Sequence, residues 1–210
     1  TYIRTRNPNR KALADVLTYL EQGKDTLIFS SGMGAITTTY FALLQPGDHM
    51  ICNENIYGET FDAITSLVKN YGVTTTFVPF DDLDAVKAAV QPNTKMLYTE
   101  VASNPTDRLC DVAAIAEIAH EAGALLMVDN TFTTPICIKP LTLGADIVIN
   151  SLTKFLNGHS DAQQPGQRAH AQHQRHRAQA EGQHRQSTPH RTGRGQRHQL
   201  HALQRPAGHQ

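Results

Sequence analysis

Hydrophobic and polar positions follow two different periods along residues 10–162. Apolar residues first recur three or four positions apart, which predicts a helix closed by Gly23. Short apolar runs without strict alternation come next and predict strands at residues 26–30, 49–52, 73–78, 96–99, 124–128 and 146–149. Helical periods between these runs predict helices at residues 32–44, 59–70, 82–89 and 112–122.

The order of these elements predicts the fold class. Strands without strict alternation are buried on both faces, and intervening helices indicate parallel crossovers. We therefore predict an α/β domain over residues 1–162, built on a mostly parallel, doubly wound sheet. Ligands in such sheets bind beyond the carboxyl ends of the strands. Four polar positions fall at these ends: Ser30-Ser31, Glu100, Asp129 and Ser151.

The composition changes abruptly after Ala162. Residues 163–210 contain no Val, Ile, Met, Phe, Tyr, Trp or Cys and are rich in Gln, His, Arg, Ala and Gly. This tail carries a formal charge of +7 and residues 1–162 carry −7, so the whole chain is neutral. A segment with so little apolar surface cannot offset the entropy of ordering, and we predict that it is disordered.

Three interpretations of the basic tail compete. A nucleic-acid-binding tail fits its charge, but the tail lacks lysine and any aromatic ring on which bases could stack. A histidine-rich metal tract fits its eight histidines, but they show no ligand spacing. We favour the third interpretation, an out-of-frame translation of a GC-rich gene. Reading the encoding DNA in three frames around Ala162 would show whether the tail is an out-of-frame translation.

Several classes of protein are disfavoured by the chain. No apolar run approaches the ~20 residues of a membrane span, and no secretory signal is visible. Cys52, Cys110 and Cys137 are odd in number, scattered and without a C-x-x-C pair. Reduced thiols in a cytoplasmic protein are therefore expected, with no metal site.

A lysine directly after a predicted buried strand is the strongest candidate for chemistry. Lys154 follows the apolar residues 147–149, and the hydroxyls of Ser151 and Thr153 beside it can bind a phosphate. A lone lysine in this place is usually a surface residue. Its amine can also condense with a carbonyl, since its pKa falls readily on desolvation or near other cations.

Three further features supply what a pyridoxal 5'-phosphate (PLP) site needs. Asp129 ends another predicted strand and could pair with a ring nitrogen. Gly32 and Met33 open a helix, whose unpaired amides form an anion site. Tyr57, before a glycine, offers a ring for stacking. Each feature is weak alone, since strand-ending acids and glycine turns are common.

The run from Asp146 to Ser160 resembles the lysine signature of the PLP-dependent enzymes of cysteine and methionine metabolism. This trans-sulfuration family includes cystathionine γ-synthase, cystathionine γ- and β-lyases, methionine γ-lyase and O-acylhomoserine sulfhydrylases. The resemblance covers Thr1 to Ala162 almost without gaps, and Leu152 is a mild departure. It implies the large domain of the type I PLP-dependent transferase fold, incomplete here.

The resemblance also implies roles for the candidates named above. Lys154 would carry the cofactor as a Schiff base and move protons between substrate and cofactor. Asp129 would hold the pyridine nitrogen, and Tyr57 would stack on the ring. The phosphate would be bound by the backbone of Gly32 and Met33 and by the hydroxyls of Ser151 and Thr153.

Further roles come from the resemblance alone. Asn104 would bind the cofactor's phenolic oxygen. Tyr2 and Arg4 would reach into the site of a neighbouring subunit, with Arg4 on the phosphate and Tyr2 near the substrate, which implies a homodimer or homotetramer. Glu59 stands where methionine γ-lyases often carry cysteine, which argues mildly against methionine as substrate.

We therefore predict β- or γ-elimination or γ-replacement that breaks or makes a carbon–sulfur bond, of the cystathionine γ-lyase or γ-synthase type. The substrate would be a sulfur-containing or O-acylated amino acid such as cystathionine or O-acylhomoserine. The alternatives are an O-acylhomoserine sulfhydrylase or methionine γ-lyase and, from another class, a non-catalytic fragment with a nucleic-acid-binding tail. Chains of the family are nearly twice as long, and their later part supplies an arginine for the substrate carboxylate. We expect this fragment to be inactive on its own.

Overall fold

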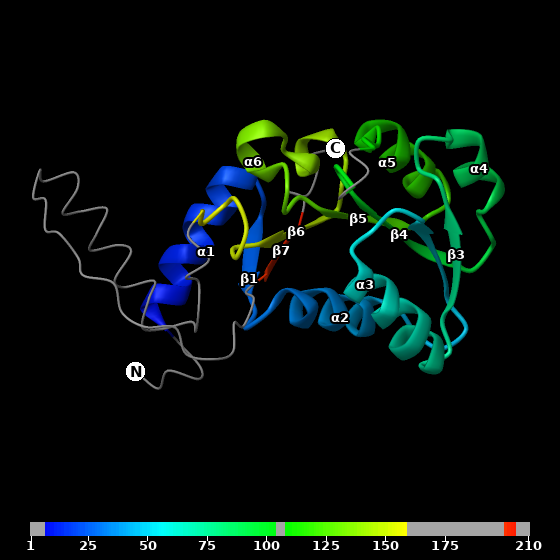
Figure 1. The fold of residues 1–210 in the computed structure, drawn as a ribbon, viewed down its shortest axis with the longest axis horizontal. Helices are drawn as coiled ribbons and strands as arrows, with labels where there is room; N and C mark the ends of the chain where they lie inside the picture. Colours follow the sequence, from blue (N-terminus) through cyan, green and yellow to red (C-terminus); the bar gives the residue numbers. More distant parts are fainter. Residues whose placement is uncertain (1–6, 104–107, 159–199, 205–210) are drawn as a thin grey trace, which may run out of the picture.

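A computed structural model describes residues 7–103, 108–158 and 200–204 of the chain. This part is built on a sheet of seven strands in the order β1-β7-β6-β5-β4-β2-β3 (Figure 1). The strands are β1 Asp25–Ile28, β2 His49–Asn53, β3 Thr74–Val78, β4 Thr94–Glu100, β5 Leu125–Asp129, β6 Ile147–Ser151 and β7 Leu200–Gln204.

Helices connect most successive strands, as the apolar periods predict. They are α1 Pro8–Glu21, α2 Gly32–Leu43, α3 Gly58–Ala63, α4 Leu83–Ala88, α5 Val112–Glu121 and α6 Thr134–Cys137. A π-helical turn, Ile64–Val68, continues α3, and a 3-10 turn, Pro140–Leu143, precedes β6. None of the helices in the described ranges is both long and apolar enough to cross a membrane.

The predicted doubly wound, mostly parallel sheet is confirmed. Strands β2, β3, β4, β5 and β6 all pair in parallel with their neighbours in that group. Figure 1 shows α2 and α3 along one face of the sheet and α4 and α5 along the other. The carboxyl ends of β4, β5 and β6 consequently lie next to one another, and the register pairs Glu100 with Asp129.

Apolar side chains of the strands fill a separate core on each face. Ile51 packs in the core under α4 and α5, whereas its neighbours Met50 and Cys52 pack in the core under α2. β2 is buried at every position for this reason, and β6 likewise. The continuous apolar runs in the sequence therefore reflect burial on both faces.

Polar side chains fix where the helices begin. Asn7, Asp82 and Asp111 accept backbone N–H groups in the first turns of α1, α4 and α5. The Ser31 hydroxyl caps α2 by accepting the Gly34 N–H at 3.0 Å. Such caps satisfy amides that have no partner within the helix. Helix α2 thus starts at a defined residue, Gly32, just beyond β1.

The expectation of disorder throughout residues 163–210 is not met at residues 200–204. These residues form β7, which pairs antiparallel with both β1 and β6. β1 and β6 both offer unpaired backbone groups to the space between them, and an inserted strand satisfies both rows. The five residues also include both leucines of the tail. Residues 159–199 and 205–210 lie outside the described residues, so disorder and a frame error remain predictions there.

Candidate active site

A cavity of about 150 Å³ lies at the carboxyl ends of β4, β5 and β6, beside the start of α2. Six residues predicted from the sequence line it: Gly32, Met33, Tyr57, Asp129, Ser151 and Lys154. Its other lining residues are Ser31, Ile36, Glu59, Glu100, Thr131 and Phe132. The structure therefore brings together residues that are more than 120 positions apart in the chain, such as Gly32 and Lys154.

Of the other predicted residues, Thr153 is the one that the structure describes, and it does not line this cavity. Thr153 is buried, and in the chain it directly precedes Lys154, which lines the cavity. Tyr2, Arg4 and Asn104 lie outside the described residues, so the roles implied for them stay predictions.

Asp129 ends β5 with its carboxylate at the cavity. Its Oδ1 accepts the Thr131 backbone N–H at 2.9 Å. Burial raises the pKa of Asp129 to about 6, and hydrogen bonds from Thr131 oppose this rise. The carboxyl is therefore mostly ionised at neutral pH, which suits a partner for a protonated ring nitrogen.

Glu100 is a second acid on the cavity wall that the predicted site left out. Its Oε1 accepts the Tyr57 backbone N–H at 2.6 Å, so it secures the start of α3. Burial raises the pKa of Glu100 to about 8, the Asp129 charge adds to the rise, and the Tyr57 N–H opposes it. Its place at a strand end was visible in the sequence, but nothing there indicated the contact with Tyr57.

Tyr57 is the N-cap residue that directly precedes α3, and about half of its side chain is exposed. The pKa of Tyr57 is raised to about 12, mainly by a hydrogen bond with Glu59 and to a smaller extent by burial. The phenol is consequently neutral at neutral pH. A neutral ring at the cavity wall is available for stacking.

The start of α2 forms the anion-binding side of the cavity. Gly32 and Met33 occupy the first helical positions, where amides lack partners inside the helix. Ser151, at the end of β6, faces the same cavity, and its own N–H donates to the Thr131 hydroxyl at 2.8 Å. Amides and a hydroxyl therefore converge where a phosphate could bind.

Lys154 lies in the turn that follows β6. Its backbone N–H donates to the Ser151 carbonyl at 3.3 Å, and its carbonyl accepts the Gly158 N–H at 2.9 Å. These bonds hold the turn that presents the side chain to the cavity. The neighbouring Phe155 ring meets Phe132 edge-on, with the ring centroids 5.9 Å apart.

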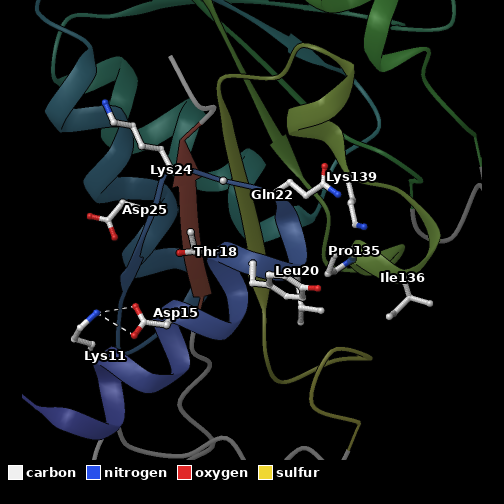
Figure 2. Close-up of a pocket in the computed structure, with 12 residues that line it drawn as sticks. Lys11, Asp15, Thr18, Leu20, Gln22, Lys24, Asp25, Pro135, Ile136 and Lys139 are labelled. Atoms are coloured by element: carbon white, nitrogen blue, oxygen red, sulfur yellow. Dashed lines mark hydrogen bonds and ion pairs between the residues drawn. The ribbon is translucent and has the colours of Figure 1, made fainter. Parts of the chain in front are cut away.

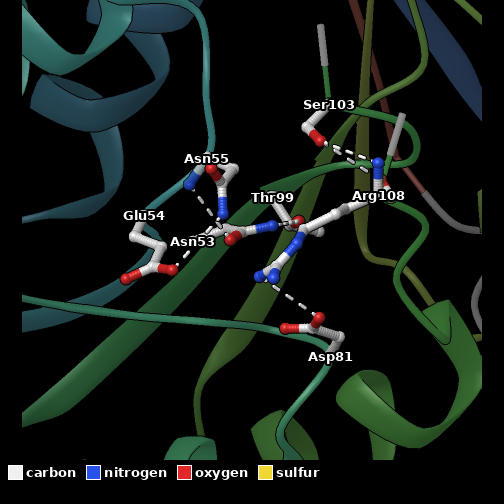
Figure 3. Close-up of polar contacts among 7 residues, drawn as sticks. All are labelled: Asn53, Glu54, Asn55, Asp81, Thr99, Ser103 and Arg108. Atoms are coloured by element: carbon white, nitrogen blue, oxygen red, sulfur yellow. Dashed lines mark hydrogen bonds and ion pairs between the residues drawn. The ribbon is translucent and has the colours of Figure 1, made fainter. Parts of the chain in front are cut away.

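A polar cluster beyond β4 joins Ser103, Arg108 and Asp81 (Figure 3). The Ser103 N–H donates to the Arg108 carbonyl at 3.0 Å, and the Arg108 N–H donates to the Ser103 hydroxyl at 3.1 Å. The Arg108 guanidinium also pairs with Asp81 at 3.3 Å. Ser103 and Arg108 are thereby held to each other just beyond β4.

A larger hollow of about 730 Å³ lies between α1 and α6, and Figure 2 shows its lining. Its wall carries the exposed ion pair of Lys11 and Asp15 and the exposed side chains of Tyr19 and Ile136. None of the predicted site residues that the structure describes lines it. The smaller cavity is therefore the candidate active site.

The fold and the cavity define a doubly wound α/β protein with the groups that a PLP site requires. The profile of the Cys/Met metabolism PLP-dependent enzymes matches residues 1–184, and the chain belongs to this family.

The chain is also similar to individual proteins whose names fit this family. The chain is 46% identical over 160 residues to cystathionine gamma-lyase of Bacillus subtilis (strain 168), covering 76% of this chain and 42% of that protein. It is 43% identical over 160 residues to a probable cystathionine gamma-synthase of Herpetosiphon aurantiacus, covering 76% of this chain and 50% of the relative. The crystal structure of cystathionine gamma-lyase from Lactobacillus plantarum complexed with L-serine superposes with a TM-score of 0.78 at 34% identity.

The superposition covers 98% of this chain and 44% of the Lactobacillus plantarum chain. This chain therefore spans half or less of the length of these relatives.

Proposed function

We propose that the chain is the cofactor-binding part of an enzyme that uses PLP to make or break carbon–sulfur bonds in amino acids of the cysteine and methionine pathways. One observation carries the proposal: Lys154, Asp129 and the start of α2 share one cavity. The family itself is PLP-dependent.

The residues of the cavity fit the cofactor chemically. Bound PLP would supply an aldehyde carbon that reacts with amines and a ring that withdraws electrons. The anion site at Gly32 and Met33 suits its phosphate, with the hydroxyls of Ser151 and Thr153 as further donors. The ionised carboxylate of Asp129 suits a protonated ring nitrogen.

Each side chain of the cavity has a separate role in the proposed reaction. The Lys154 amine would hold the cofactor and would move protons at the substrate's α and β carbons. Asp129 would keep a proton on the ring nitrogen. Tyr57 holds the ring by stacking, while Glu100 secures the Tyr57 backbone from below α3.

We infer a small amino-acid substrate of the cystathionine or O-acylhomoserine kind, with γ-lyase or γ-synthase chemistry. The names of the relatives support this class. O-acylhomoserine sulfhydrylase and methionine γ-lyase chemistry remain the alternatives. Glu59 on the cavity wall supports a substrate other than methionine.

The proposed enzyme works as a homodimer or homotetramer in the cytoplasm. Tyr2 and Arg4 would complete the site of a neighbouring copy. The cysteines Cys52, Cys110 and Cys137 are free, which suits a reducing compartment. The 210-residue chain alone should show no lyase turnover, since the family's carboxylate-binding arginine has no counterpart in residues 163–210.

Trapping the cofactor on the protein tests the proposal. The chain should develop a new absorbance band when PLP is added, and borohydride should then fix the cofactor on the peptide that contains Lys154. Lys154→Ala is the control and should lose both signals. Label on Lys139 or Lys95 instead would refute the lysine assignment. Salt-dependent binding to DNA without PLP uptake would favour the nucleic-acid alternative.

A further inference from the structure

A buried acid outside the cavity connects α1 to two of the strands that form the cavity. Glu21, the last residue of α1, has no exposed surface. Its Oε1 accepts hydrogen bonds from Asn130 Nδ2 at 3.0 Å and from Asn150 Nδ2 at 2.6 Å. Both asparagines are also fully buried. These contacts join residues more than 100 positions apart in the chain.

Each asparagine is the chain neighbour of a candidate site residue. Asn130 directly follows Asp129, and Asn150 directly precedes Ser151 at the end of β6. The same two strand ends are tied to each other, because the Asn130 N–H donates to the Ile149 carbonyl at 2.8 Å. Glu21 therefore bridges the points from which Asp129 and the Lys154 turn begin.

The buried environment of Glu21 disfavours the ionised form of its carboxyl group. Burial raises the pKa of Glu21, while hydrogen bonds from Asn130 and Asn150 and the charge of Lys139 oppose the rise. Among the described residues, Glu21 Oε2 and Asn150 Oδ1 have no hydrogen-bond partner although both atoms are buried. Burying a carboxyl costs free energy that its hydrogen bonds must offset, so the bonds from Asn130 and Asn150 are what make the buried position of Glu21 possible.

Asn130 is restrained on a second side as well. Its Nδ2 also donates to the Ile138 carbonyl at 3.0 Å, and its Oδ1 accepts the Thr133 hydroxyl. The side chain of Asn130 thus links α1, the strand end and the turn around α6. A shift of Glu21 would be transmitted directly to the backbone beside Asp129.

We propose that Glu21 is a positioning residue of the cofactor site, which fixes the ends of β5 and β6 through Asn130 and Asn150 and so sets Asp129 and Lys154 relative to each other. Glu21 touches neither the substrate nor the cofactor in this role. The inference rests on the proposed function only for the parts assigned to Asp129 and Lys154.

Hydrogen exchange of the full chain without cofactor tests the positioning by itself. In Glu21→Ala, peptides over residues 129–134 and 149–153 should exchange at least about tenfold faster, while peptides over β2 stay unchanged, because the lost bonds restrain only these strand ends. Glu21→Gln keeps a carbonyl oxygen for both asparagines and should stay within about threefold of the unmodified chain. Asn150→Ala removes one of the two bonds and should reproduce the local effect if Glu21→Ala does not fold.

Leu17→Ala is the matched control, since Leu17 is a buried residue of the same helix. It should weaken α1 without speeding exchange at the two strand ends. Equal effects of Leu17→Ala and Glu21→Ala would show that Glu21 only stabilises the helix. Failure of Glu21→Gln to restore protection, or unchanged exchange in Asn150→Ala, would likewise overturn the proposal.

Cofactor trapping then separates this inference from the proposed function. Borohydride labelling of Lys154 should fall about tenfold or more in Glu21→Ala at a fixed, subsaturating PLP concentration and should be retained in Glu21→Gln. Changed exchange without any labelling in the unmodified chain would refute the PLP function and leave the positioning intact. Normal labelling in Glu21→Ala together with unchanged exchange would refute the positioning alone.

Discussion

Glu100 and Asp129 are paired in register at the carboxyl ends of β4 and β5 and share one cavity. Burial raises the pKa of both acids, to about 8 for Glu100 and to about 6 for Asp129. The pair therefore holds one proton at neutral pH, mainly on Glu100, and one negative charge, mainly on Asp129. The structure thus places a carboxylate at the proposed ring-nitrogen position and a neutral acid beneath Tyr57.

The acid pair should make the stability of the chain fall as pH rises. Both folded pKa values lie above their unfolded values, so the folded state binds more protons between about pH 4 and 8. The stabilisation is complete below the unfolded pKa values and is lost as pH rises through about 6 and then about 8. Glu100→Gln removes the upper step and should raise the urea midpoint at about pH 8 relative to that at about pH 5.

Urea unfolding of the unmodified chain and the variant across this pH range measures the effect. Glu117→Gln on the exposed side of α5 is the control and should leave the pH profile unchanged. Parallel profiles for the unmodified chain and Glu100→Gln would contradict the raised pKa of Glu100.

Asp129→Asn should separate cofactor binding from the state of the ring nitrogen. The proposed phosphate contacts at Gly32, Met33 and Ser151 do not involve this side chain, so some PLP should still bind. The ring nitrogen should lose its proton, because an amide offers no negative charge to hold it. Nitrogen NMR of ¹⁵N-labelled PLP would detect this directly. In a complete enzyme the same change should cost roughly 3 kcal/mol of transition-state stabilisation, about a hundredfold in rate. A protonated ring nitrogen in Asp129→Asn would contradict the role.

Two glycines allow backbone strain to be separated from steric overlap. Gly47 and Gly144 both have left-handed backbones, with φ of 93° and 104°. An added Cβ at Gly47 meets nothing within 4 Å, whereas at Gly144 it would lie 2.8 Å from the Ala116 Cβ. We expect Gly47→Ala to lower the free energy of unfolding by about 1 kcal/mol and Gly144→Ala by about 1–3 kcal/mol more. Equal urea midpoints for the two variants would contradict the contact between Gly144 and α5.

Much of the fold was predictable because its signals are local or periodic. Strands buried on both faces appear as apolar runs, and Gly23 or Asp82 mark helix ends within a residue or two. The short elements were missed: α6 and the 3-10 turn before β6 have too few residues to show a period. The π-helical continuation of α3 has no sequence signal that distinguishes it from an α-helix.

The candidate site was predictable only in part. Residues at strand ends or in a known signature, such as Asp129 and Lys154, could be named from the chain alone. The contact of Glu100 with the Tyr57 backbone could not, because it depends on how α3 lies against β4. Glu21 gave no signal either, since an acid at a helix end is normally solvated, and here the packing of α1 buries it.

The strand β7 allows a test of whether residues 200–204 stabilise the sheet or are disordered like the rest of the predicted tail. The structure places Ala202 opposite Leu27 of β1 and Ile149 of β6, so both sides of its backbone face a partner strand. Proline at this position has no N–H and must lose a ladder bond whichever way the residue faces. Ala202→Pro should therefore lower the free energy of unfolding by about 1–3 kcal/mol and loosen β1, which has β7 as its strand neighbour in the described sheet.

Ala207→Pro, beyond the end of the strand, is the control and should have little effect. Urea unfolding with exchange over β1 measures both. If Ala202→Pro leaves the midpoint and the protection of β1 unchanged, then β7 does not contribute to the sheet, and the prediction of a disordered tail holds for these residues too.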